Sequence, residues 1–133
     1  MSTTSPYRTT SDLVLAVLKR ARVLAVGQAV DVDDYNNIAG EIDSIIRKIA
    51  GLEIVYIADA NNIPGAFFSD LVDIVIGECA TTLGLSGQEY VEAVNKGLGG
   101  AGGMKPGDGA AAQSLKVIAR GRPTYEPLQI MNF

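Results

Sequence analysis

The strongest helical signal in the chain runs from Asp31 to Gly51 and reads DVDDYNNIAGEIDSIIRKIAG. Asp31 is a favourable N-cap residue, and two more acids follow in the first turn, where the helix dipole favours negative charge. Arg47 and Lys48 fall in the last turn, and the glycine is a common stop signal. Apolar residues recur at helical spacing and form one stripe: Tyr35, Ile38, Ala39, Ile42, Ile45, Ile46 and Ile49. The stretch predicts an amphipathic helix.

Four other segments predict helices around this one. They run from about 10 to 26, from 64 or 65 to 83, from 86 to 96 and from 110 to 119. The segment 64–83 is apolar nearly all round in its middle, as expected of the central helix of a bundle. We therefore predict an all-α fold, a bundle of four to five helices.

Details of the helix ends and of one connection can also be predicted. We expect Thr10 or Ser11 to cap the first helix, and Ser86 with Glu89 matches a capping box. The run Glu53–Ile57 is β-prone and predicts a short extended segment. The domain organisation that follows is a flexible arm over 1–9, a helical domain over 10–120 and an extended interaction tail over 121–133.

Residues 97–109 contain seven glycines in thirteen positions and predict a flexible Gly-rich loop. Gly97, Gly99 and Gly102 match the G-x-G-x-x-G spacing. The dinucleotide-binding fingerprint requires a strand before these glycines and a helix directly after them. Here a helix precedes them, and Pro106 interrupts before the next helix, so we expect no cofactor.

The final segment, residues 121–133, reads GRPTYEPLQIMNF, and we name it the C-terminal extension. Two prolines forbid a regular helix, and the residues before them are biased toward extended conformations. Burying its four aliphatic and aromatic side chains near the end gains roughly 6–12 kcal/mol, whereas ordering its backbone costs about 13–26 kcal/mol. The extension therefore needs strand pairing or a large shared interface, which predicts contact with another subunit.

Charge is distributed unevenly along the chain. Residues 31–92 carry twelve acidic residues against two basic ones, whereas residues 1–30 and 93–133 each carry a net charge of +3. An acidic surface for solubility is one interpretation, and head-to-tail association of identical subunits with an acidic body and basic ends is another. No contiguous basic face is present, which argues against sequence-specific DNA binding.

Residue types that carry catalysis or bind metals are scarce. The chain has no histidine, and its single cysteine, Cys79, lies in an apolar run typical of a structural buried thiol. The acids from Asp31 onward do not fit a calcium-binding loop. Asp70, Asp73 and Glu78 are expected to form a solvated face. We find no catalytic constellation and predict that the protein is not an enzyme and binds no metal.

The order of these features resembles a known family. The run from Thr10 leads to Leu24-Ala-Val-Gly27-Gln-Ala, an acid-capped helix follows from Val32, an Ile63-Pro64 step begins the next helix, and a basic, proline-containing extension closes the sequence. This pattern resembles the head-to-tail adaptor proteins of tailed bacteriophages, also called head-completion or tail accessory factors, of the short-tailed-phage type. The resemblance covers roughly residues 10–120.

The resemblance implies a virion structural protein at the head–tail junction, made in the cytoplasm of the bacterial host. It implies a homo-oligomeric ring, usually of twelve subunits, that binds the portal protein and tail proteins and extends the channel for packaged double-stranded DNA. No apolar stretch is long enough to span a membrane. On this reading, two arginines form ion pairs at the base of the extension and its apolar residues anchor it to the portal or an adjacent subunit. The candidate interface residues are Arg120, Arg122, Tyr125, Leu128, Ile130, Met131 and Phe133.

Two alternatives stay open at the level of sequence. One is a small helical regulatory module that forms a dimer and binds one partner. The other is a DNA-binding helical protein, for which the first helix, with Lys19, Arg20 and Arg22, is the only candidate recognition helix.

Overall fold

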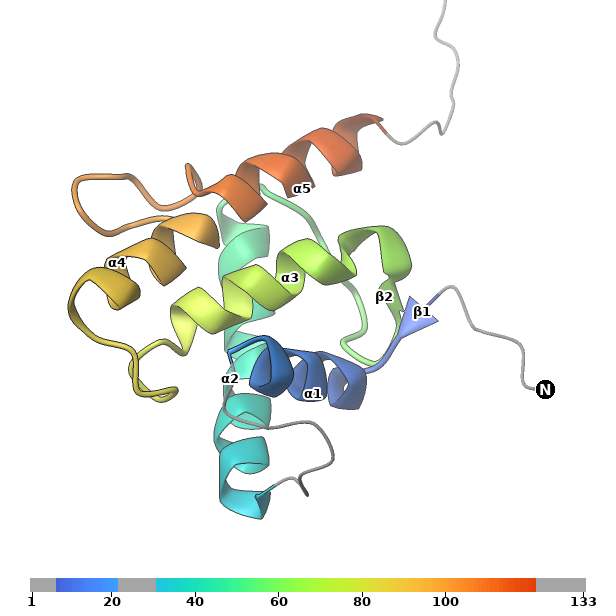
Figure 1. Ribbon diagram of the computed structural model, residues 1–133. Helices are drawn as coiled ribbons and strands as arrows, with labels where there is room; N and C mark the ends of the chain where they lie inside the picture. Colours follow the sequence, from blue (N-terminus) through green and yellow to red (C-terminus); the bar gives the residue numbers. More distant parts are fainter. Residues whose placement is uncertain (1–6, 22–30, 122–133) are drawn as a thin grey trace, which may run out of the picture.

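Helix α3 (Gly65–Glu78) lies at the centre of the fold and contacts every other helix (Figure 1). The structure, a computed structural model, describes residues 7–21 and 31–121. Around α3 lie four helices: α1 (Thr10–Arg20), α2 (Val32–Gly51), α4 (Gly87–Lys96) and α5 (Ala110–Gly121). The predicted all-α fold is confirmed.

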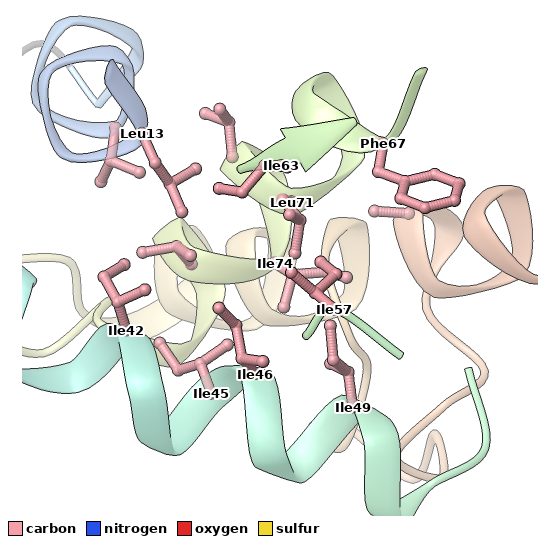
Figure 2. Close-up of a cluster of buried hydrophobic side chains, with 14 of the residues drawn as sticks. Leu13, Ile42, Ile45, Ile46, Ile49, Ile57, Ile63, Phe67, Leu71 and Ile74 are labelled. Atoms are coloured by element: carbon pink, nitrogen blue, oxygen red, sulfur yellow. The ribbon is translucent and has the colours of Figure 1, made fainter. Parts of the chain in front are cut away.

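The apolar stripe of α2 packs against α3, as predicted from its spacing. Figure 2 shows Ile42, Ile46 and Ile49 of α2 directed toward the side chains of α3, among them Leu71 and Ile74. All five of these side chains are nearly inaccessible to solvent. Burying an aliphatic side chain of this size stabilises the fold by about 1.5–3 kcal/mol, so the α2–α3 contact is a major part of the core.

Asp31 caps α2 as expected, but the cap of α1 differs from the prediction. Thr9 is the N-cap, and its hydroxyl accepts from the Asp12 amide at 3.1 Å while the Asp12 carboxylate accepts from the Thr9 amide at 3.0 Å. Thr10 instead donates its hydroxyl hydrogen bond to the Ala60 carbonyl at 2.9 Å. The helix ends at Arg20 rather than near 26, and residues 22–30 lie outside the described residues.

The predicted extended run Glu53–Ile57 is not a strand. Glu53 adopts a positive φ of 60°, which turns the chain out of α2, and the run then follows an irregular path with three buried apolar side chains. The strands are instead β1 (Tyr7–Arg8) and β2 (Ile63–Pro64), which pair antiparallel. Residues 7–9 are therefore part of the fold and not of a flexible arm.

Helix α3 ends at Glu78, five residues before the predicted end at Leu83. The chain has to reverse here because α4 packs directly on the backbone of α3. A Cβ atom on Gly77 would lie 2.8 Å from the Ala93 carbonyl oxygen, and one on Gly97 would lie 2.5 Å from the Asp73 carbonyl oxygen. Only glycine permits this approach at both positions.

Ser86 precedes α4 as predicted, but its side chain makes no capping hydrogen bond, so the predicted capping box is absent. The predicted Gly-rich loop follows α4, and its backbone makes several hydrogen bonds. Leu98 is fully buried, and its carbonyl accepts from the amides of Gly107 at 2.8 Å and Gly109 at 3.0 Å. The loop is held by its own backbone hydrogen bonds and leads directly into α5.

Candidate interaction surface

The predicted interface residues follow the last helix. Arg120 lies in the last turn of α5, exposed to solvent, and makes no ion pair within the part of the chain that the structure describes. The other six, Arg122, Tyr125, Leu128, Ile130, Met131 and Phe133, lie outside the described residues. The structure thus shows where the C-terminal extension begins.

Helix α5 runs antiparallel to α3 and lies beside it (Figure 1). At its start, the Ala112 amide donates to the Gly97 carbonyl at 3.1 Å. Further along, the Ser114 hydroxyl donates to the Asp70 carboxylate of α3 at 2.7 Å. Gly121 therefore lies toward the N-terminal end of α3, and the C-terminal extension begins there.

A largely apolar groove lies toward the other end of α3. It is formed where the end of α1 meets α3 and α4, and it has a volume of about 270 Å³. Its apolar lining comes from Ala21, Ile76, Leu85 and Ala93, which are all partly exposed. We name it the α1–α3–α4 groove.

Charged residues surround this groove. On one side Arg20 and Asp73 form an ion pair, with 3.1 Å between Arg20 Nη1 and Asp73 Oδ1. Along α4 lie Glu89 and Glu92, both exposed and without an ion pair among the described residues. Lys96 completes the rim near the end of α4. The groove combines an apolar floor with an edge that carries both acidic and basic side chains.

The acids predicted to form a solvated face are instead paired. Asp73 contacts Arg20, and Glu78 accepts from Lys48 Nζ at 2.7 Å. Asp70 accepts the Ser114 hydroxyl hydrogen bond. The basic partners come from α1 and α2, which are distant in sequence but adjacent in the fold. Partly exposed ion pairs of this kind contribute about 0.2–1 kcal/mol each, so they fix how the helices meet more than they stabilise the fold.

The first helix is also less available to DNA than its composition indicates. Three basic residues were predicted in this helix. Of these, Arg20 is held by Asp73 and by the Ser69 carbonyl, to which it donates at 3.2 Å. Lys19 is exposed, and Arg22 lies outside the described residues. This arrangement weakens the interpretation of α1 as a recognition helix.

A second groove of about 300 Å³ lies along the C-terminal half of α2. It is lined by Asp43, Arg47 and Ala50 of the helix and by Tyr56, whose side chain is 77% exposed. Its lining is more polar than that of the α1–α3–α4 groove, and it lies beside the irregular segment after α2. Sequence reasoning missed both grooves.

Cys79 is buried, as predicted, and lies just after α3. Burial, with smaller contributions from Glu41 and Glu78, raises the pKa of its thiol to about 12. Since the thiolate is the reactive form, this environment suits a structural residue and not a nucleophile.

Several glycine amides of the Gly-rich loop are used within the protein. Gly99 donates to the Val94 carbonyl at 2.8 Å, and the amides of Gly107 and Gly109 both donate to Leu98. The loop follows a helix, without the preceding strand that the dinucleotide fingerprint requires.

In residues 7–21 and 31–121, no group of three or more acidic or cysteine side chains is arranged to hold a metal ion. None of the helices in these residues combines the length and the apolar character needed to cross a membrane.

The chain matches no protein-family profile, no curated protein and no solved structure.

Proposed function

We propose that this protein is a structural subunit of a head-to-tail adaptor, a ring that joins the portal of a phage head to its tail. The observation that carries the proposal is the placement of the last helix. Helix α5 is packed against the central helix, yet it ends in the exposed Arg120, so the C-terminal extension begins on the surface of the domain. An extension with apolar residues that starts at the surface is suited to reach another protein.

Surface charge supports the same proposal. The start of α2 presents Asp31, Asp33 and Asp34, all exposed and without ion pairs among the described residues. The end of α5 presents Arg120. Opposite charges at separate places on one subunit favour association in which unlike surfaces meet, as they do in a ring. Acidic side chains that line a channel would also keep DNA from adhering to it.

The proposal extends to composition and location. The subunits form a ring, of twelve copies on the family pattern, at the head–tail junction of the virion. The ring binds the portal protein on one side and tail proteins on the other, and completes the head after DNA packaging. The resemblance of residues 10–120 to adaptor proteins and the fold of five helices support this proposal.

The test is the assembly mass by light scattering, first of the protein alone and then mixed with portal particles from the same source. We expect about one copy to bind per portal subunit. A stable dimer that does not respond to portal particles would contradict the proposal and favour a dimeric regulatory module. A mobility shift of short duplex DNA, measured over a range of salt concentrations, separates DNA binding from both.

A further inference from the structure

We propose that the last turn of α2 is a conformational switch with two helix ends. In one state the helix ends at Gly51, as observed, and Glu53 has the left-handed backbone conformation. In the other state the helix ends at Ile49, and Gly51 takes the left-handed conformation instead. The second state lengthens the irregular segment after α2 by two residues. The switch lies within one subunit and does not depend on the proposed adaptor function.

The observed end of α2 has the hydrogen bonds of a Schellman motif. The Glu53 amide donates to the Ala50 carbonyl, and the Ile54 amide donates to the Ile49 carbonyl, both at 3.0 Å. This motif requires a left-handed residue directly after the C-cap, a position that glycine usually occupies. Here the position is held by Glu53, with a φ of 60°, and no other non-glycine residue in the described part of the chain has a positive φ.

The glycine that suits such a position lies two residues earlier. Gly51 is the stop signal that the sequence predicts, yet in the structure it is an exposed residue of the helix without a positive φ. The left-handed conformation disfavours a residue such as Glu53 by about tenfold relative to glycine. Glycine is also unfavourable within a helix. Both local preferences therefore favour the shorter helix, with Gly51 after its C-cap.

Tertiary packing favours the observed end. Ile54 follows the left-handed residue and is only 3% exposed, as part of the hydrophobic core. In the shorter helix Leu52 takes this position after the left-handed residue, and Leu52 is 36% exposed in the observed state. Each end thus presents an aliphatic side chain for contact with the last turn. A local preference for one end is opposed by core packing at the other, which is the kind of conflict that a two-state element requires.

The rest of α2 is held in place, so the change is confined to its last turn. Ile49 is fully buried, and Lys48 Nζ lies 2.7 Å from the Glu78 carboxylate of α3. By contrast, residues 50–53 are all partly or largely exposed.

The switch also alters the groove along the C-terminal half of α2. Ala50 and Tyr56 both line this groove, and they lie on either side of the turn that changes. The shape of the groove therefore follows the state of the helix end.

Amide hydrogen exchange of the full chain, measured by NMR and corrected for intrinsic rates, tests the switch. The Leu52 amide donates to the Lys48 carbonyl in the observed state, and a Schellman motif at Gly51 would give it the Arg47 carbonyl. It is therefore protected in both states, whereas the Glu53 and Ile54 amides lose their acceptors in the shorter helix. We expect these two amides to exchange at least about tenfold faster than that of Leu52. Equal protection of all three amides would overturn the proposal, since it would indicate either simple fraying or a single helix end.

Gly51→Ala should remove the second state. An added Cβ atom would have no other atom within 4 Å, so the observed state accepts alanine, whereas the left-handed state does not. We expect the Glu53 and Ile54 amides to exchange about tenfold more slowly or less. Gly40→Ala is the matched control, because it adds a Cβ atom in equally open space in the interior of α2 and leaves the helix end unchanged. Equal effects of the two substitutions on these amides would overturn the proposal.

Glu53→Gly tests the same balance from the other side. Glycine removes the cost of the left-handed conformation from the observed end, so the Glu53 and Ile54 positions should again exchange about tenfold more slowly. Glu53→Gln keeps that cost and removes only the charge, and we expect it to leave the exchange rates unchanged. Equal slowing by glycine and glutamine would assign the effect to charge and contradict a switch based on backbone conformation.

Discussion

The Ser114 hydroxyl of α5 donates a hydrogen bond of 2.7 Å to the Asp70 carboxylate of α3. The two residues are separated by 44 positions in sequence, and both side chains are partly buried. This contact fixes the position of α5 along the central helix, and with it the point at which the C-terminal extension begins.

Removing this hydroxyl should loosen the last helix. For Ser114→Ala we expect a loss of about 1 kcal/mol in the free energy of unfolding, since a hydrogen bond to a carboxylate is lost but water can replace part of it. Urea denaturation followed by circular dichroism measures the change. Ser44→Ala on the exposed face of α2 is the control, because the Ser44 hydroxyl has no hydrogen-bond partner among the described residues. Equal effects of the two substitutions would argue against the role given to Ser114.

Gly97 should tolerate no side chain. A Cβ atom there would meet the Asp73 carbonyl oxygen at 2.5 Å, and backbone cannot move aside without separating α3 from α4. We expect Gly97→Ala to destabilise the protein by about 2–3 kcal/mol. Thermal unfolding of the purified variant measures it.

Gly40 provides the matched control for Gly97. It lies in the interior of α2, and a Cβ atom added there would have no other atom within 4 Å. Gly40→Ala should stabilise the protein by about 0.5–1 kcal/mol, because alanine favours the helix. A similar loss of stability at both positions would show that the close approach at Gly97 is not the cause of the destabilisation by Gly97→Ala.

The Cys79 thiol should make stability depend on alkaline pH. Its pKa is about 12 in the fold against 9.0 for the ordinary thiol, so the folded state retains a proton that the unfolded state releases. The contribution of the Cys79 thiol to the free energy of unfolding is fully present below about pH 9 and is lost as the pH rises toward 12. Wild type should therefore lose stability relative to Cys79→Ala across this range. Parallel pH profiles for the two proteins would contradict the assignment.

Deleting residues 121–133 should separate folding from assembly. The core of the described residues ends at Leu115, with Ile118 and Ala119 packed against it, so we expect a folded, helical monomer with a melting temperature close to that of wild type. Assembly should be abolished. Circular dichroism and light scattering check the two halves of this prediction, and a truncated protein that still completes particles would contradict it.

Local signals predicted much of the fold. Helix α2 was predictable from its Asp31 cap, its apolar stripe and its glycine end, since all three act within a few residues. The same holds for the burial of Cys79 and for the central position of α3. These features depend on the local spacing of apolar residues and not on the tertiary contacts between distant segments.

Features that depend on distant partners were not predictable. Asp73 was expected to face solvent because its partner, Arg20, comes from another helix 53 residues away. Glu53–Ile57 has β-prone residues but, in the part of the chain that the structure describes, pairs with no strand. The α1–α3–α4 groove is formed by three helices, and no local pattern marks Ile76 or Ala93 as its lining. The sequence did carry a weak signal for this groove. Helix α3 is apolar over more of its surface than a single contact face requires, so part of its apolar surface could line a groove.

The backbone hydrogen bonds of the Gly-rich loop have a consequence for how the domain opens. The carbonyls of Gly97 and Leu98 accept amide hydrogens from Gly107, Gly109 and Ala112, beside the point where Gly97 touches α3. Helices α3, α4 and α5 are thus joined at one small backbone junction. None of them can detach without breaking it, so the three amides should exchange with deuterated solvent only when the whole unit unfolds.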